Sequence, residues 1–424
     1  MKRSSVRAFV ALAVLVVTPG HAAAQLPPVD SLVARALQRA PSLAALKARA
    51  AEARENARVA GALADPMLEW MWQDVGFPRN TVGEEEMSMT GPQLTQALPF
   101  PGKRGAKRAA ASADALVRER ELAAARRDVA RDVRTLYARL WALDREREAL
   151  TASRDVLAAL TASARERYSA GAAESDPMLA ARLAAHRVDE RLDDLESDVV
   201  AMGAALVRLT GVERAVGPDA RVPSPPSFDS AAVALSRDAL AAGSAELATS
   251  EAGVTAAEAG LRAARLERWP DFTLGAGVGF RGAYERVVTL RAGLDLPLWS
   301  IGARRAGARA AEHALEAARA DRADAEARAQ ADAARLLAQA ERSARQVRRY
   351  REQVVPDTQL AFEAAQSNYR VGRGELKPVL DGLGAWLEAR TALAQREAEA
   401  YVTWAELAAL SGRGPEAGRE GEGR

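Results

Sequence analysis

The chain has 424 residues, with 59 lysines and arginines against 57 aspartates and glutamates, and it contains no cysteine. The absence of cysteine excludes disulfides, thiolate metal sites and an N-terminal lipid-modified cysteine. The basic residues lie opposite nearly as many acidic ones and are not interleaved with aromatics, which argues against a nucleic-acid partner.

The N-terminus follows the pattern of a secretory signal peptide. A basic start precedes an apolar stretch at 8–17 and three alanines at 22–24. This stretch is shorter than the ~20 apolar residues that a membrane-spanning helix requires, and no later run reaches that length. We therefore expect residues 1–24 to be a cleaved signal peptide, the alternative being a buried N-terminal helix.

A first repeat is expected over 25–212. After a helix that Pro41 interrupts, alternating apolar and polar residues predict strands at 66–76 and 87–98, the second weakened by Gly91 and Pro92. Two long helices are expected to follow, and these are 103–168 and 177–210.

A connector at 213–230 contains four prolines and leads into a second repeat, 231–412. The same features recur in the same order, predicting strands at 271–280 and 287–297 and long helices at 303–369 and 378–411. Pro356 is expected to kink or break the first of these two helices. The polar residues 413–424 are expected to be a disordered tail.

The strands alternate between apolar residues on one face and glycine or polar residues on the other. Such alternation fits a lipid-facing barrel strand with a wet lumen, and it fits a half-buried strand of a soluble sandwich equally well. The residues expected to face lipid are Leu68, Trp70, Trp72, Phe272, Leu274, Val278, Phe280, Leu290 and Leu294.

The helices favour the barrel. No glycine or proline occurs from Ala106 to Ala170, and about 65 residues at roughly 1.5 Å per residue extend about 100 Å. A charged, alanine-rich helix of that length needs neighbours in a bundle or an α-barrel.

The number of strands predicts the number of copies. Four strands cannot close, since known membrane barrels begin at about eight strands, and an eight-stranded barrel fills its interior with side chains. The simplest closed pore is a trimer of about twelve strands. We expect a mainly α protein in which a transmembrane β-barrel continues into a long α-helical barrel.

Several motifs together carry a family resemblance. The stretches Ala64-Asp65-Pro66-Met67 and 91–104, GPQLTQALPFPGKR, occur with two Tyr-x-x-Gly turns and with helix ends at Leu209 to Gly211 and Leu410 to Gly412. This set resembles the outer-membrane efflux protein family, which is TolC-like, over about 30–412. The Gln-x-Leu-Pro-Phe-Pro-Gly-Lys-Arg form at 96–104 is most similar to members that are paired with heavy-metal resistance-type RND pumps.

The resemblance implies a homotrimeric exit duct that spans outer-membrane lipid, extends into the periplasm and docks with a periplasmic adaptor and an inner-membrane RND pump. Its cargo would be heavy-metal cations. The alternatives are a type I secretion duct and a periplasmic coiled-coil scaffold. No nucleophile–base pair, P-loop or metal-spaced His/Cys cluster is present in the sequence, so we expect no enzyme, no cofactor and no metal site.

By the same resemblance, the turns between the long helices face the adaptor. Gly171 and Gly372 could instead be plain helix caps. The candidate contacts are Arg167, Tyr168, Gly171, Ser175, Tyr369, Arg370, Gly372 and Leu376.

Asp381 lies where relatives carry an acidic ring at the periplasmic mouth, and Ala180 stands at the matching place of the first repeat. The alternative is an exposed Asp that interacts favourably with the start of its helix. The residues expected at the strand–helix junctions are Pro99, Pro101, Gly102, Pro297 and Gly302. Four methionines on or near the first strands, at 67, 71, 87 and 89, are expected to fill space rather than bind soft metals.

Overall fold

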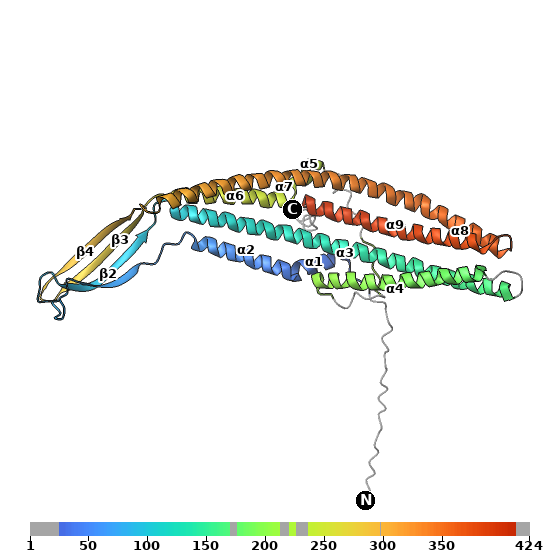
Figure 1. The fold of residues 1–424 in the computed structure, drawn as a ribbon, viewed down its shortest axis with the longest axis horizontal. Helices are drawn as coiled ribbons and strands as arrows, with labels where there is room; N and C mark the ends of the chain where they lie inside the picture. Colours follow the sequence, from blue (N-terminus) through green and yellow to red (C-terminus); the bar gives the residue numbers. More distant parts are fainter. Residues whose placement is uncertain (1–24, 170–175, 213–219, 226–235, 297, 413–424) are drawn as a thin grey trace, which may run out of the picture.

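The computed structural model describes residues 25–169, 176–212, 220–225, 236–296 and 298–412. The predicted signal peptide, most of the connector, Gly171, Ser175, Pro297 and the C-terminal tail lie outside the described residues. Figure 1 shows an elongated molecule with the strands at one end and the helices running along its length.

The first repeat contains four helices and two strands in the part of the chain that is described. These are α1 (Val29–Arg39), α2 (Pro41–Val59), β1 (Met67–Gln73), β2 (Met89–Leu98), α3 (Lys103–Ser169) and α4 (Asp176–Thr210).

The second repeat follows the same order. Its elements are α5 (Arg237–Ala242), α6 (Ala245–Leu266), β3 (Asp271–Arg281), β4 (Tyr284–Asp295), α7 (Ile301–Arg349), the π-helix η2 (Tyr350–Val354), α8 (Val355–Arg370) and α9 (Leu376–Ser411).

The four strands form one antiparallel sheet in the order β1-β2-β3-β4. The β3–β4 connection is a tight turn at Gly282-Ala283, with Gly282 at φ 65°. Although it is a central strand, β2 contains Gly91 and Pro92, and no pairing with β3 occurs at these two residues. Proline has no N–H to donate, and a Cβ at Gly91 would collide with the carbonyl of Val278.

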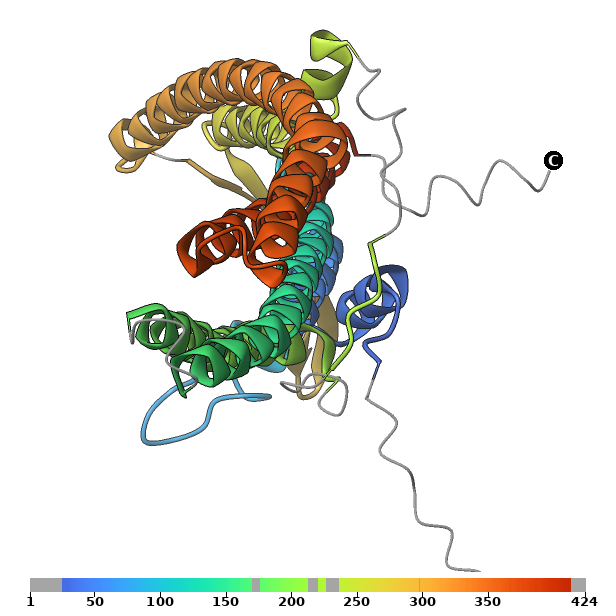
Figure 2. The ribbon, with the colours of Figure 1, turned by 90° about the vertical axis from the view of Figure 1, so that its right-hand side faces the viewer.

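The helices repeat the order of the strands. Helix α3 packs against α2 and α6 near the sheet and against α4 and α9 further away, while α7 packs against α6 and α9 and α8 packs against α9. The layer therefore reads α2 and α4, then α3, then α6 and α9, then α7 and α8. Seen along the long axis, these helices follow an arc (Figure 2).

The apolar core is concentrated in the half of the helical layer that lies away from the sheet. One cluster joins α1, α3, α4 and α9 around Val133, Tyr137 and Leu206. A second joins the ends of the two long hairpins around Leu195, Phe362 and Val379. Nearer the sheet, α6 and α7 contact each other through alanines and charged pairs such as Arg265–Glu312 (2.9 Å).

Local sequence accounts for several helix ends. Ser236 and Ser244 accept hydrogen bonds from the backbone N–H groups of Ala239 and Leu247, as N-caps do. Gly211 and Gly412, which follow α4 and α9, have φ of 68° and 71°, a left-handed conformation that glycine adopts without steric cost.

Several expected strands have different bounds in the structure. The strand expected at 66–76 ends at Gln73, because Asp74 has a φ of 52° that turns the chain. The strand expected at 287–297 is Tyr284–Asp295.

The helix expected at 303–369 is interrupted close to Pro356, as predicted, because the missing N–H of this proline cannot complete the α-helical ladder. The interruption takes the form of the π-helix η2, which ends at Val354. The predicted interruption at Pro41 is confirmed, since α1 ends at Arg39 and Pro41 begins α2.

Candidate functional site

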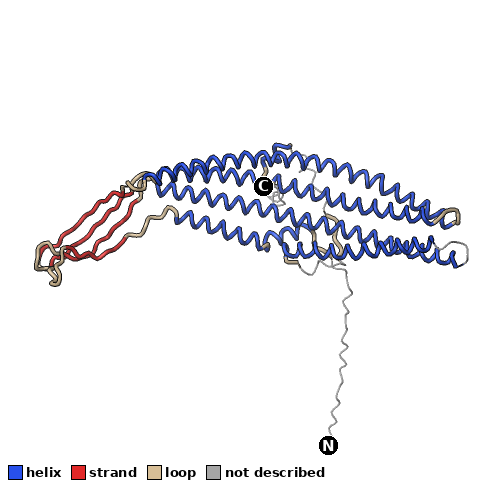
Figure 3. Tube along the Cα trace, in the orientation of Figure 1, coloured by secondary structure: helices blue, strands red, loops and turns tan. Residues whose placement is uncertain are grey.

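The candidate surfaces lie at opposite ends of the molecule. The sheet forms one end, and the turn between α8 and α9 lies at the other, beside the C-terminal end of α3 and the start of α4 (Figure 3). We call the α8–α9 turn and these described helix ends the tips.

One face of the sheet is apolar. The strand register aligns Leu68 with Leu94, Leu94 with Ala276 and Ala276 with Leu290. Residues opposite each other share a face and alternate residues return to it, so all nine residues expected to face lipid lie on this one face. Eight of them are exposed, with Leu290 79% accessible, and Val278 is partly buried.

The other face carries polar residues and glycine. It holds Glu69, Gln93, Thr95 and Arg291 by the same register. Met67, Met71 and Met89 also lie here, and a guanidinium nitrogen of Arg291 is 3.8 Å from the sulfur of Met71. Among the described residues no group of three or more His, Cys, Asp or Glu side chains could hold a metal ion.

The sheet has two unpaired edges, since β1 pairs only with β2 and β4 only with β3 among the described strands. The two edge strands are continuous in the chain with the two outer helices of the helical layer: β1 follows α2, and β4 precedes α7. Open strand edges present free N–H and C=O groups, which invite pairing with another chain.

A buried charge cluster connects the sheet to the helices. Lys103, the first residue of α3, is only 1% exposed, and its Nζ lies 2.9 Å from Asp271 at the start of β3 and 3.6 Å from Glu267 at the end of α6. Asp271 also accepts a hydrogen bond from the Phe100 backbone N–H (2.8 Å). The cluster therefore joins β2, α3, α6 and β3 at one point.

The expected junction residues lie beside this cluster. Pro99, Pro101 and Gly102 separate β2 from α3, and Gly102 has a φ of 94°. Gly302 is the second residue of α7. Sequence reasoning missed the burial of Lys103 and its pairing with Glu267 and Asp271, because nothing in the neighbouring sequence indicates these contacts.

Glu267 has a pKa below its ordinary value. Burial pushes the pKa of this carboxyl up, but the hydrogen bond from Lys107 and the positive charges of Lys107 and Lys103 outweigh it. Lys107 Nζ lies 2.9 Å from Glu267. The cluster is therefore electrostatically stabilised when Glu267 is ionised.

At the tips, the two tyrosines of the Tyr-x-x-Gly turns differ. Tyr369 is buried, the Arg167 guanidinium lies 4.3 Å from its ring centroid, and an Arg167 nitrogen donates to the Tyr369 carbonyl (3.0 Å). Tyr168 is 49% exposed. Arg167 thereby connects the first tip to the second.

The remaining candidate tip residues are also divided. Arg370 is exposed, and Gly372 is exposed with a φ of 73°, so it ends the helix in the manner of a glycine cap. Leu376 is only 2% exposed and packs in the apolar cluster of the tips. Its side chain is therefore not free for a partner in this arrangement.

A groove of 1020 Å³ separates the ends of α4 and α9, and both Asp381 and Ala180 line it. Asp381 is exposed and its carboxylate lies 2.7 Å from Lys377 Nζ, one turn earlier in α9. The carboxylate expected at the mouth thus has a cation beside it, which sequence reasoning did not anticipate.

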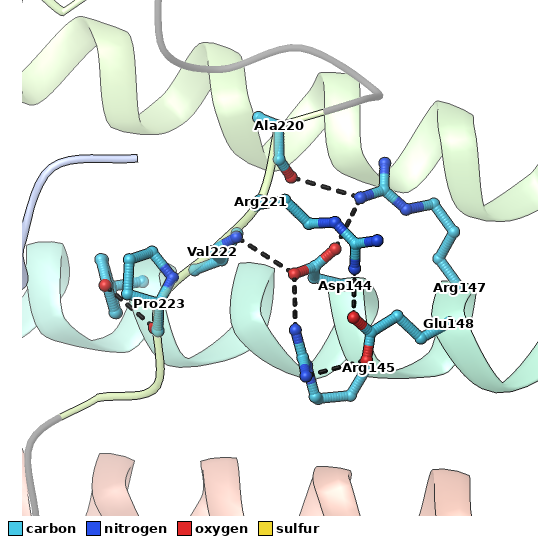
Figure 4. A network of polar contacts seen from close by, with 9 residues as sticks. Asp144, Arg145, Arg147, Glu148, Ala220, Arg221, Val222 and Pro223 are labelled. Carbon is cyan, nitrogen blue, oxygen red and sulfur yellow. Dashed lines mark hydrogen bonds and ion pairs between the residues drawn. The ribbon is translucent and has the colours of Figure 1, made fainter. Parts of the chain in front are cut away.

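A polar network fastens the connector to α3 at mid-length (Figure 4). Buried Asp144 accepts hydrogen bonds from Arg145 (3.0 Å), Arg147 (2.6 Å) and the Val222 backbone N–H (3.1 Å). The Tyr137 hydroxyl donates to the Pro223 carbonyl (3.0 Å), and burial raises the pKa of Tyr137 to about 12. The network thus fastens the described part of the connector, residues 220–225, to the long helix of the first repeat.

A family model described as "Outer membrane efflux protein" matches residues 32–212 and 236–413, that is, both repeats. The chain belongs to the outer membrane efflux protein family. Members of this family are efflux channels rather than enzymes, and the family places the chain in the outer membrane.

Several solved structures share the fold of this efflux protein. VceC from Vibrio cholerae is 22% identical with a TM-score of 0.74, covering 90% of this chain and 96% of its own. CusC is 16% identical with a TM-score of 0.76, covering 95% and 96%. CmeC from Campylobacter jejuni is 15% identical with a TM-score of 0.75, covering 93% and 88%. No curated protein matches the chain significantly in sequence.

None of the helices in the described part of the chain is both long enough and apolar enough to cross a membrane.

Proposed function

We propose that this protein is one of three identical subunits of an outer-membrane exit duct. The observation that carries the proposal is the shared order of the two layers. Strands β1 to β4 lie side by side in the same spatial order as the helices that continue them. The sheet and the helical layer therefore have their unpaired edges on the same two sides of the molecule. An arc of this kind is completed by further copies joined edge to edge.

The number of copies follows from the sheet. Two copies would supply eight strands, which side chains fill, whereas three supply about twelve, enough for an aqueous lumen. In this arrangement the apolar face, with Leu68, Trp70 and Leu290, lies against outer-membrane lipid. The face with Glu69 and Arg291 lines the pore.

The strand length supports a membrane span. Strand β3 has 11 residues, and at roughly 3.3 Å per residue with a tilt of about 45° it covers about 25 Å, the height of the apolar band in such barrels. The helices then form a periplasmic tube. At about 1.5 Å per residue, the 67 residues of α3 are roughly 100 Å long.

Transport through this duct is passive in our proposal, and the energy comes from an inner-membrane RND pump through a periplasmic adaptor. The tips are the proposed adaptor contacts, with Tyr168, Arg370 and Gly372 as the exposed candidates. Arg167 is partly buried, and Tyr369 and Leu376 support the tips from within. Asp381 is proposed to attract cations at the periplasmic mouth of the duct, and the neighbouring Lys377 partly neutralises its charge.

The proposed cargo is heavy-metal cations, which rests on the resemblance of the Gln-x-Leu-Pro-Phe-Pro-Gly-Lys-Arg motif at 96–104 to members that serve heavy-metal RND pumps. A duct need not bind its cargo, so a type I secretion duct is the second candidate, and export assays with metals, drugs and proteins distinguish the two. A periplasmic coiled-coil scaffold is the third, and it predicts a water-soluble protein.

Bilayer recording tests the proposal. Purified protein should form a trimer that resists SDS until heated, and it should open discrete conductance steps in a planar lipid bilayer. A water-soluble monomer that inserts no channel would overturn the proposal.

A further inference from the structure

Helix α4 presents a band of unpaired acidic residues along one open edge of the molecule. It packs on its neighbours through Val188, Leu192 and Leu195. About half a turn away on the helix lie Glu190, Asp193 and Asp194, because 3.6 residues complete one turn. All three are exposed, and none makes an ion-pair contact among the described residues, while Asp194 interacts electrostatically at longer range with Arg191 of the same helix.

The opposite open edge presents a basic band near the end of α7. Here α7 faces inward through Leu336, Ala340 and Ser343. The outward side carries Arg345, Arg348 and Arg349, which are all exposed. Arg345 has a 3.6 Å contact with Glu341 of the same helix, and Arg348 and Arg349 have no ion-pair partner in the described part of the chain.

Ion pairs on α3 give the position of the acidic band along the tube. Asp189 pairs with Arg154 at 3.1 Å, and Arg191 pairs with Glu146 at 2.8 Å. The acidic band therefore lies at the level of α3 residues 146–154.

The basic band is placed by contacts that run through α9 and the tips. Arg134 of α3 stacks over Trp404 of α9, and Arg335 of α7 lies 3.9 Å from Glu406, two residues on. Arg167 of α3 contacts Tyr369 of α8 in the same manner at the tips. Positions in α7 and α8 thus match those in α3 with an offset of about 200 residues, and Arg345 to Arg349 fall at the level of the acidic band.

We propose that these two bands form an ionic seam between neighbouring subunits, the acidic band of one copy lying against the basic band of the next. The inference rests on the cyclic assembly proposed above and adds the residues that hold it. Opposite charges at the same level attract only in a head-to-tail ring. Joining acidic edge to acidic edge would bring like charges together, so the seam also selects against a two-fold pairing.

Cysteine cross-linking tests the seam, since the chain has no cysteine of its own. Asp193→Cys combined with Arg348→Cys should give covalent dimers and trimers on mild oxidation in outer membranes. The control pairs Asp193→Cys with Ala320→Cys, an exposed position on α7 that is 28 residues, or about 42 Å, further from the tips. That pair should remain uncross-linked.

The outcomes separate the seam from the duct. An SDS-resistant trimer without cross-linking at Asp193 and Arg348 overturns the seam and leaves the trimer standing. The absence of any trimer in the unmodified protein overturns the duct and the seam together.

Charge exchange gives an independent test. Replacing Arg345, Arg348 and Arg349 by glutamate should weaken trimer association roughly tenfold, since several rim pairs each contribute a small amount. Replacing Glu190, Asp193 and Asp194 by arginine should do the same, and the two sets combined in one chain should restore association. Failure of the combined variant to recover, when it is folded by circular dichroism, would contradict the seam.

Discussion

The two repeats form the same arrangement of strands and helices with different side chains, and they differ most at the two ends of the long helices. At the sheet end, α3 begins with Lys103, which is buried among acids, whereas α7 begins with Ile301, which is 49% exposed. At the tip end, Tyr369 is buried under Arg167 and Tyr168 is exposed. Between these ends α3 is continuous, while η2 and Pro356 divide α7 from α8.

Some features occur in both repeats because both form the same layer of strands and helices, and other features occur in one repeat only. Both repeats have the strand pair, the long helix and the returning helix, because each must continue the same tube. The buried lysine and the buried tyrosine each lie where one repeat contacts the other, so the differences mark contacts between repeats.

The largest expected effect is at the sheet junction. Lys103→Ala leaves Asp271 and Glu267 without their buried cation and should lower the free energy of unfolding by about 3 kcal/mol. This value is at the lower end for the loss of one partner of a buried ion pair, because both carboxylates are partly exposed. Ile301→Ala, the matched change in the second repeat, should cost less than about 1 kcal/mol. Guanidinium unfolding in detergent measures both, and equal costs would contradict the difference drawn here.

The second effect is at the tips. Tyr369→Ala removes a buried ring and its contact with Arg167 and should destabilise the tip by about 2 kcal/mol. Tyr168→Ala should change stability by no more than about 0.5 kcal/mol. Hydrogen exchange should therefore speed up in α8 and the start of α9 only in the first variant. Similar exchange in the two variants would refute the assignment of Arg167 and Tyr369 as the link between tips.

A smaller effect depends on pH. The pKa of Glu267 is lowered in the fold, so its contribution to stability is present above the ordinary value of 4.5 and is lost as pH falls through the folded pKa. Solvent screening keeps the contribution below about 1 kcal/mol, because the side chain is 37% exposed. Glu267→Gln should flatten the fall in thermal stability between neutral and acidic pH, and an unchanged pH profile would argue against this role.

The smallest expected effect is at the periplasmic mouth. Asp381→Ala removes an exposed carboxylate whose pair with Lys377 contributes about 0.3–0.5 kcal/mol, so stability should hardly change. Single-channel conductance should rise, or block by cations should weaken. Lys377→Ala, which leaves Asp381 unpaired, should strengthen cation block. Identical currents in all three proteins would remove Asp381 from the mouth.

The main elements could be predicted because their signals are local. Alternation over Phe272 to Phe280 and an uninterrupted helical stretch after Lys103 each lie within one segment, and both elements are present in the structure. The apolar face of the sheet could be predicted for the same reason, since side chains alternate along a strand whatever its neighbours are.

The remaining features depend on segments far apart in the chain. Lys103 is buried because α6 and β3 bring Glu267 and Asp271 to it from more than 160 residues away, and nothing near Lys103 indicates this. Leu376 was expected at an accessible tip, but it packs in a cluster that both hairpins build. The division of α7 from α8 was foreshadowed by Pro356, but not the π-helix before it.

Native mass spectrometry of the protein extracted from outer membranes in mild detergent tests the central claim most directly. That claim is that one arc of four strands and their helices is a third of a closed tube. We predict particles that contain three copies of the chain and no other protein, because three copies are sufficient to close the barrel. Particles containing one or two copies, from membranes in which the protein conducts ions, would contradict it.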